Sequence, residues 1–449
     1  MSIRTRLALV VLAGLALTTA CDPTYAERPI AQLIGAPAAD STLVGCDQAS
    51  TAVTLSASAH LDPACTYVAG FTISGSHVVL DCRGATIESV PDAGGTGISI
   101  STPADADLTD VTVRNCVVKG FLNSLRVTRE GFRALRVGHE YDHGPSSIVV
   151  EHSNFYRSKG TGVFVDAYVT GVTLRGLEIA GAGSVGVYLE AGSKGTTVIG
   201  DTIYDNGYAG TGPDGNRLQG TNYRYHSTGR EGIAVDGSRD NVIRGNRIAH
   251  NSAGGIFLYK NCGEYATTQP GQWWNRPYGS DGNLIEGNTI STGPSGVWVG
   301  SRMSENQLFM DCSDPVYVSN SLTRIVVDHA RDNTIRDNDF VNLDYGVRVE
   351  DDGTQVSRNR FRAASPTALA LVVGTRYRKL KLGLPVVGTV VADNRADLAG
   401  TITPYRSVPG AGPAIFTGNL SGGEPATLVP GPAPPVNPFL FVKDFWTAP

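Results

Sequence analysis

A short phrase recurs along the chain and limits the folds that it can adopt. It reads "VTVRNCVV" at 111–118 and "NVIRGNRI" at 241–248, and a second phrase follows most copies, as in "TGVFVDAY" at 161–168 and "EGIAVDGS" at 231–238. The tightest spacings between copies of the second phrase are 24 residues, from Gly162 to Gly186, and 23 residues, from Gly232 to Gly255. Short β phrases at this period, with no helical periodicity between them, predict a solenoid with two or three strands per coil.

One column of the first phrase is rich in asparagine. Its members are Asp201, Asn246, Asn288, Asn338, Asn359, Asn394 and Asn419. Stacked asparagines at one turn position can hydrogen-bond the amides of their neighbours, so we expect a structural ladder without a catalytic role. The composition agrees with turn-rich β structure, because glycine is abundant (54 residues), methionine is scarce (3) and only 18% of the residues are charged.

The asparagine column, the "GI.V" strands and the opening "HVVLDCRGATI" (77–87) resemble the right-handed parallel β-helix of the pectate-lyase-like superfamily. The resemblance covers roughly residues 70–425. It implies an all-β fold, a right-handed parallel β-helix (solenoid) with an Asn ladder and long loop insertions. It is much less specific for the reaction, because that superfamily includes lyases, hydrolases, epimerases and non-enzymatic binding proteins.

The N-terminus has the pattern of an export signal. Residues 1–20 combine a positive region, a short apolar region and small residues before a cleavage site that could lie as late as residue 26. The motif "LTTAC" also resembles a bacterial lipoprotein box, which makes Cys21 a candidate for lipidation. We therefore expect an exported protein, periplasmic or extracellular, whose one route to the membrane is an N-terminal lipid.

The remaining chain divides into three expected parts. Residues 21–69 form an N-terminal segment or cap, 70–425 the β-helix, and 426–449 a Pro-rich tail. We expect a monomer. The formal net charge of −5 and the lack of a basic stripe argue against a nucleic-acid partner.

Six cysteines follow Cys21, an even number that suits an oxidising compartment. Sequence alone does not fix their connectivity. The pairs to test first are Cys46–Cys65, Cys82–Cys116 and Cys262–Cys312.

In the second phrase, alternate residues point to opposite sides of the strand. Ile233 and Val235 exemplify the core side. The second position after each glycine then faces outward, and its large members are Phe164, Tyr188, Phe257, Trp298 and Arg348, with Ala234 leaving a gap among them. Such a column is either ordinary packing beneath a covering loop or a platform on which sugars stack.

The fourth position of the phrase holds Asp166, Glu190 and Asp236, followed by Tyr259 and, further on, Glu350. Neighbouring strands lie about 4.8 Å apart, so carboxylates on successive coils repel one another. A bound cation such as Ca²⁺, raised pKa values or a substrate would offset the repulsion, and simple solvation of splayed side chains is the alternative. Whether Glu190 and Asp236 occupy adjacent coils stays open, because 203–230 could hold an extra turn.

Further candidates lie beside this row. Arg230 and Glu231 open the Asp236 strand, and Lys260 and Arg302 follow strands on the same face. The insertions at 128–147, 204–230, 259–282 and 300–332 could wall a substrate groove, and the loop 261–282 is rich in aromatic residues. It contributes Trp273, Trp274 and Arg276 as candidate sugar contacts.

Three functions fit these residues. A glycoside hydrolase would use two acids of the row as proton donor and base, and a lyase would use a Lys or Arg base with an acid-held Ca²⁺ to eliminate at a uronic acid. A C5-epimerase shares the chemistry of the lyase, and a non-enzymatic glycan-binding protein would use the aromatics alone. In each case the partner is a polysaccharide or oligosaccharide. The sequence favours a polysaccharide-degrading enzyme, slightly on the side of the hydrolase, because acids outnumber bases on the strand face.

Overall fold

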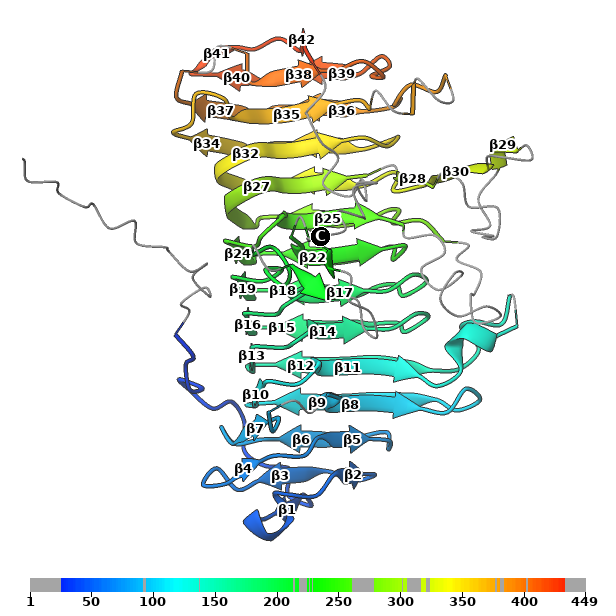
Figure 1. Ribbon diagram of the computed structural model, residues 1–449, viewed down its shortest axis with the longest axis vertical. Helices are drawn as coiled ribbons and strands as arrows, with labels where there is room; N and C mark the ends of the chain where they lie inside the picture. Colours follow the sequence, from blue (N-terminus) through cyan, green and yellow to red (C-terminus); the bar gives the residue numbers. More distant parts are fainter. Residues whose placement is uncertain are drawn as a thin grey trace, which may run out of the picture.

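The computed structural model describes residues 26–91, 94–136, 138–212, 215–217, 224–225, 227, 229–260, 278–300, 302–304, 316–319, 324–375, 378–379, 383–400 and 403–432. Figure 1 shows the strands stacked in coils along one axis, from the N-terminal coils at the bottom to the C-terminal coils at the top. Every pairing between coils is parallel apart from the β40–β41 hairpin. The predicted right-handed parallel β-helix is confirmed.

Each coil contributes to three faces, which we call A, B and C in chain order. Face A is a 13-stranded sheet in the described chain. Its strands are β1 (Thr42–Val44), β3 (Ala59–Leu61), β6 (Val79–Asp81), β9 (Leu108–Arg114), β12 (Pro145–Glu151), β15 (Val172–Arg175), β18 (Thr197–Ile199), β23 (Val242–Arg244), β26 (Leu284–Glu286), β31 (Thr334–Arg336), β33 (Gln355–Ser357), β36 (Val390–Ala392) and β39 (Ile415–Thr417).

Faces B and C belong to one larger sheet, because β27 (Thr289–Val299) and β32 (Asp339–Val349) run through both. The other strands of face B are β4 (Thr66–Tyr67), β7 (Thr86–Glu88), β10 (Val117–Lys119), β13 (Asn154–Tyr156), β16 (Glu178–Ala180), β19 (Thr202–Tyr204), β24 (Arg247–Ala249), β34 (Arg360–Ala363), β37 (Arg395–Leu398) and β40 (Leu420–Ser421), which pairs with β41 (Glu424–Pro425). The other strands of face C are β2 (Val53–Leu55), β5 (Phe71–Ile73), β8 (Thr96–Thr102), β11 (Asn123–Arg129), β14 (Thr161–Val165), β17 (Val187–Leu189), β22 (Glu231–Asp236), β25 (Gly254–Tyr259), β35 (Leu369–Val373), β38 (Tyr405–Ser407) and β42 (Val429–Pro430).

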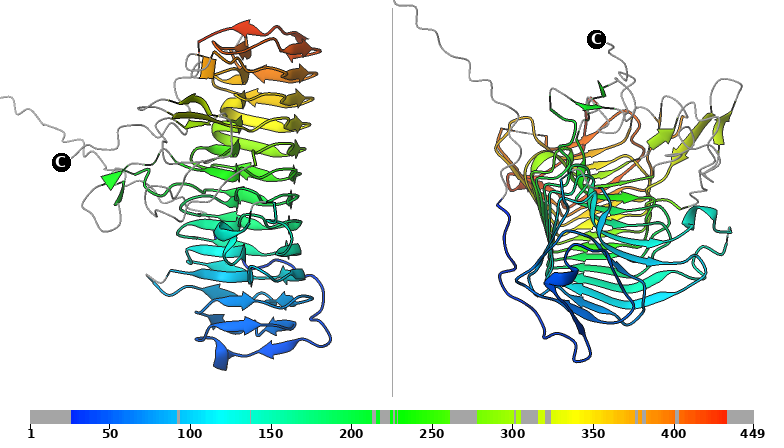
Figure 2. Two further views of the ribbon diagram at one scale, coloured as in Figure 1. Left: turned by 90° about the vertical axis from the view of Figure 1, so that its right-hand side faces the viewer. Right: turned by 60° about the horizontal axis from the view of Figure 1, so that its bottom comes forward.

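The remaining elements project from the stack or close its lower end. They are β20 (Asn216–Arg217), β21 (Arg224–Tyr225), β28 (Arg302–Ser304), β29 (Val316–Ser319), β30 (Arg324–Asp328) and the 3₁₀ helices η1 (Cys46–Gln48) and η2 (Phe132–Ala134). Figure 2 shows the projecting pieces gathered on one side of an otherwise regular column. Among the described residues, no helix is long and apolar enough to cross a bilayer.

The core is a continuous column of Val, Ile and Leu side chains from all three faces, including the predicted Ile233 and Val235. The glycine that opens the second phrase is required by close packing between coils. A Cβ on Gly162 would lie 2.5 Å from the carbonyl oxygen of Gly186 one coil further on, and one on Gly186 would lie 2.7 Å from that of Gly232. The repeat therefore keeps glycine where two backbones approach.

The predicted asparagine ladder is present at the bend between faces A and B. Each member accepts a hydrogen bond from the backbone N–H of the preceding member, from Asp201 N to Asn246 Oδ1 (2.8 Å) up to Asn394 N to Asn419 Oδ1 (3.0 Å). Two shorter ladders that sequence comparison missed lie at the other bends. Asn241, Asn283 and Asn333 form one, and Asn206 and Asn251 the other.

In the described chain, the strands that pair within the stack run from β1, which begins at Thr42, to β42, which ends at Pro430. Disulfides join Cys46 to Cys65 and Cys82 to Cys116, with Cα–Cα distances of 5.3 and 4.8 Å, as expected for an exported protein. The third expected pair, Cys262–Cys312, lies outside the described residues, as do the signal region 1–20, Cys21 and residues 433–449 of the predicted tail.

Candidate active site

The outward columns of face C have the register that the repeat predicts. Tyr188 on β17 pairs with Ala234 on β22, which pairs with Phe257 on β25. Because β17 and β22 are direct neighbours, the insertion after Tyr204 adds no coil. Glu190 and Asp236 therefore lie on adjacent coils, which the sequence alone left open.

The aromatic column is not the solvent-facing platform that its position suggested. Trp298 and Phe257 have no exposed surface, and Tyr259 is 1% exposed. Their rings pack against one another, with centroids 5.6 Å apart for Phe257–Trp298 and 6.1 Å for Tyr259–Trp298, in a second apolar cluster that also holds Ala234. Ring-on-ring packing across coils buries these side chains, so most of them are unavailable as an open stacking surface.

The acid row is buried as well, and each acid with a described partner is held by a specific group. Asp166 accepts a hydrogen bond from Nε of Arg126, one coil earlier, at 2.8 Å. Burial raises the pKa of Asp166, and the Arg126 guanidinium opposes that shift. Glu190, also buried, accepts a hydrogen bond from the backbone N–H of Ala191. The solvated-carboxylate interpretation of this row does not hold.

Asp236 is engaged by a tyrosine from the preceding coil. The hydroxyl of Tyr188 donates to Oδ2 of Asp236 at 2.5 Å. Tyr188 is in register with the small residue Ala234 and packs in the same cluster, two residues before Asp236 on β22. The gap predicted at Ala234 is thus used by Tyr188 to reach Asp236.

Glu231 forms a three-residue network at the other end of the same strand. It accepts Nε of Arg230 at 3.2 Å and the hydroxyl of Tyr259 at 2.8 Å, while Nη2 of Arg230 donates to that hydroxyl at 3.1 Å. Burial alone would lower the pKa of Arg230, but Glu231 and Tyr259 hold it well above its ordinary value. A cation is therefore fixed beside a buried phenol.

The exposed part of this region is a short strip across four coils. Its ends are cationic, because the side chain of Arg126 is 36% exposed and that of Arg230 is 30% exposed. Between them lie the partly exposed Phe164 and the edge of Tyr188, whose rings stack with centroids 4.9 Å apart. We call Arg126, Phe164, Tyr188 and Arg230 the cationic strip.

The other predicted site residues lie elsewhere on the face or outside the described chain. Lys260 is buried at the end of β25, and Arg348 forms an ion pair with Glu350 at 2.7 Å, on the coil of β32. Trp273, Trp274 and Arg276 lie outside the described residues, and only the backbone of Arg302 is described. The structure therefore brings together Asp166, Glu190, Asp236, Arg230, Glu231, Tyr188 and Tyr259, but separates Arg348 and Glu350 from them.

A calcium ion does not fit the acid row. The carboxylates of Asp166, Glu190 and Asp236 do not converge on one point, since the one convergent group of three potential ligands in the described chain is Cys46, Asp62 and Cys65. Arg126 and Tyr188 already occupy oxygens of Asp166 and Asp236.

Sequence reasoning missed Arg126 and the hydroxyl roles of Tyr188 and Tyr259. Arg126 stands in the outward column one coil before Phe164, within "SLRVT" (124–128), a strand without the glycine that marks later copies. Aligning the alternation of that strand with "GVFVD" would have placed Arg126 beside the first acid.

Comparison with known proteins agrees with the fold. The family of the right-handed β-helix region matches residues 65–210 and 96–269, and the family of the periplasmic copper-binding protein NosD matches residues 212–361. The chain is a right-handed parallel β-helix protein. Among the described residues, the one convergent group of three His, Cys, Asp or Glu ligands is Cys46, Asp62 and Cys65, and its two cysteines are joined in a disulfide.

Two solved structures with the same fold are mannuronan C-5 epimerase modules from Azotobacter vinelandii. The A-module of AlgE6 is 16% identical with a TM-score of 0.56, and the match covers 84% of this chain and 91% of that one. The A-module of AlgE4 is 13% identical with a TM-score of 0.50, covering 86% and 92%. Comparison with curated protein sequences gave no match.

Proposed function

We propose that the protein is a polysaccharide-active enzyme that removes the C5 proton of a uronic acid unit, as a lyase or a C5-epimerase. The observation that carries this proposal is the pair of networks on adjacent coils, Tyr188–Asp236 and Arg230–Glu231–Tyr259. Proton removal beside a carboxylate needs a cation to neutralise that carboxylate and a base close to it. Arg230 and Tyr188 supply these two groups on one accessible edge.

The cationic strip supports an acidic glycan as the substrate class. The strands that carry Arg126 and Arg230 are three coil spacings apart, about 14 Å along the solenoid axis. A pyranose unit spans roughly one such spacing, so the two cations would meet carboxylates about three sugars apart. Phe164 and Tyr188 offer ring faces to the sugars between them.

The reaction follows from the same contacts. Arg230 pairs with the uronate carboxylate and stabilises the charge that develops on it as the C5–H bond breaks. Tyr188 passes its hydroxyl proton to Asp236 and accepts the C5 proton. In a lyase the electron pair of that bond then expels the glycosidic oxygen at C4, which takes the proton from Tyr188, while Asp236 returns its proton to Tyr188. In an epimerase a water molecule delivers a proton to the opposite face of C5, and the abstracted proton is released to solvent. Glu231 and Tyr259 are positioning residues, because they hold Arg230.

The hydrolase interpretation now has less support. It requires one acid to donate a proton and another to activate water or attack carbon. Three of the acids instead use a carboxylate oxygen to accept a hydrogen bond within the protein: Asp166 from Arg126, Asp236 from Tyr188 and Glu231 from Arg230. Export is part of the proposal, supported by the two disulfides. Cleavage near residue 20 and lipidation of Cys21 stay predictions, as does the monomeric state.

The test is incubation of the purified protein in D₂O with polymannuronate, polyguluronate and polygalacturonate. An epimerase should leave deuterium at C5, seen by NMR, whereas a lyase should give the ultraviolet absorbance of an unsaturated uronate, whose C5 carries no hydrogen. Tyr188→Phe and Arg230→Met should each lower the rate by at least about a hundredfold. Tyr345→Phe, a partly buried tyrosine on face C three coils beyond β22, is the matched control and should react at the wild-type rate.

Each alternative has its own outcome. New reducing ends with neither deuterium at C5 nor the ultraviolet absorbance of an unsaturated uronate would establish the hydrolase and reject proton abstraction. Retention of the polymers by the wild type and by both variants, with no reaction on any of them, would indicate a glycan-binding protein. A Tyr188→Phe variant with full activity would remove the proposed base while leaving the reaction class intact.

A further inference from the structure

We infer that the corner between faces B and C is a second glycan-binding surface, an acidic-polysaccharide track that leads into the site. This inference rests on the proposed function for the identity of its ligand. It begins from the exposed apolar side chains. Of the eight large ones in the described chain, four lie at this corner on successive or nearby coils: Val68 (37% exposed), Val90 (46%), Leu122 (47%) and Tyr208 (40%).

These four residues form a line parallel to the solenoid axis. They follow β4, β7, β10 and β19, whose neighbours pair in the order β4–β7–β10–β13–β16–β19. Five coil spacings separate the first from the last, about 24 Å. The first three lie on consecutive coils and Tyr208 lies three coils further on, and exposed apolar side chains that gather along one edge mark a surface with a binding partner.

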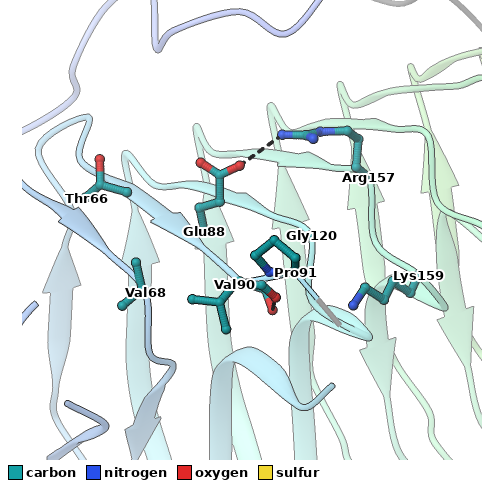
Figure 3. A pocket seen from close by; sticks show the side chains of 9 residues that line it. Thr66, Val68, Glu88, Val90, Pro91, Gly120, Arg157 and Lys159 are labelled. Atoms are coloured by element: carbon teal, nitrogen blue, oxygen red, sulfur yellow. Dashed lines mark hydrogen bonds and ion pairs between the residues drawn. The ribbon is translucent and has the colours of Figure 1, made fainter. Parts of the chain in front are cut away.

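The lower end of the line is hollowed. A pocket of about 460 Å³ is lined by Thr66, Val68, Glu88, Ser89, Val90, Pro91, Gly120, Arg157 and Lys159. Figure 3 shows Val68, Val90 and Pro91 on one side of it and Lys159 on another, with Arg157 reaching Glu88 across the rim. Apolar carbon beside cationic nitrogen suits a sugar that has C–H faces and a carboxylate.

The charge at the pocket favours an anionic ligand. Lys119 forms ion pairs with Glu27 and Glu88 at 3.2 and 3.3 Å, and Arg157 also contacts both acids. Lys159, exposed at the same corner, is a third cation beside these two acids. Three cationic side chains therefore gather where the apolar residues meet the pocket, within reach of an anionic ligand.

The upper end of the line connects to the site. Tyr208 follows Gly207, whose carbonyl accepts the backbone N–H of Arg230 at 3.1 Å. A Cβ on Gly207 would lie 2.3 Å from the carbonyl oxygen of Arg230, so the two segments are in direct contact. A glycan that lies along the corner would thus reach the guanidinium to which the proposed reaction assigns the uronate. This continuity selects the substrate chain, rather than another protein, as the occupant.

The test separates binding from catalysis. Affinity electrophoresis of the full chain in gels with long polymannuronate, polyguluronate or polygalacturonate measures binding without turnover. Leu122→Ser with Lys159→Ser should weaken binding of the preferred long polymer by roughly tenfold, and leave binding of its trisaccharide within about twofold. Val387→Ser and Arg360→Ser form the matched control, because both residues are exposed and lie away from this corner. The control should migrate as the wild type does.

The outcomes are distinct from those of the proposed reaction. If Tyr188→Phe is inactive but binds long polymer normally, and the corner variant binds it weakly, both proposals stand. If no uronate polymer reacts but the corner variant still loses affinity, the track stands and the reaction falls. Equal affinity of the corner variant and the wild type would overturn the track. So would a dimer of the wild type that Leu122→Ser dissociates, because the line would then be a self-association surface.

Discussion

Replacing Asp201 with asparagine should stabilise the protein and change how its stability depends on pH. Asp201 is the one acid in the asparagine ladder. Its Oδ1 accepts the N–H of Leu177 at 2.7 Å, but its Oδ2 is buried without a hydrogen-bond partner. In the next coil the same position is the amide nitrogen of Asn246, which donates to the carbonyl of Val198 at 2.9 Å. Asp201 can match that pattern only with a proton on Oδ2.

The magnitude follows from the pKa. Burial raises the pKa of Asp201 from 3.8 to about 8, against the opposing hydrogen bonds from the Leu177 and Gly176 backbone. A raised folded-state pKa means that the contribution to stability is fully present below pH 3.8 and is lost as the pH rises through about 8. At pH 7 the unfolded acid is ionised and the folded one is not. Roughly three pH units at about 1.4 kcal/mol each amount to about 4 kcal/mol of lost stability.

The assay is urea denaturation of the wild type and Asp201→Asn between pH 4 and pH 9. The variants should coincide near pH 4 and diverge as the pH rises, with Asp201→Asn more stable by about 4 kcal/mol at pH 7. Asn246→Asp is the reciprocal control, because it places the same acid one coil further along and should lose stability over the same range. Parallel pH profiles for wild type and Asp201→Asn would refute the reasoning.

Three further predictions concern the packing around the site and the lower coils. Arg126→Met should lower the free energy of unfolding by about 2 kcal/mol, because Asp166 stays buried without its cation while solvent screening at the partly exposed Arg126 reduces the effect. The double variant Arg126→Met with Asp166→Asn should recover most of that stability in urea melts, and no recovery would contradict the ion pair. Gly186→Ala should cost about 1–3 kcal/mol and lower the thermal midpoint, since its Cβ would lie 2.7 Å from the Gly232 carbonyl oxygen, whereas Gly94→Ala, with open space around it, should melt as the wild type does. Replacing Cys82 and Cys116 with serine opens a link between residues 34 apart and should cost about 4 kcal/mol in denaturant titrations; an unchanged midpoint would show that the link does not constrain the unfolded chain.

The fold could be predicted from the sequence because a solenoid repeats the same packing constraints in every coil. Gly162 and Gly186 mark close backbone approaches, and the asparagine column marks one bend, so each rule recurs and can be read by comparison. The two shorter ladders escaped notice because they have only three and two members, too few to stand out as a column.

The sequence predicted only part of the candidate site, for a physical reason. Alternation along a strand says which side a residue faces, but it does not say whether that side meets solvent or packs. Asp236 was found as an outward acid, yet its partner Tyr188 was expected to stack on sugar rather than to donate its hydroxyl. That partnership depends on two coils at once: a long ring on β17 and a small residue, Ala234, in register on β22. A larger side chain at Ala234 would stand between Tyr188 and Asp236, so the smallness of one residue helps to determine the contact on which the proposed chemistry depends.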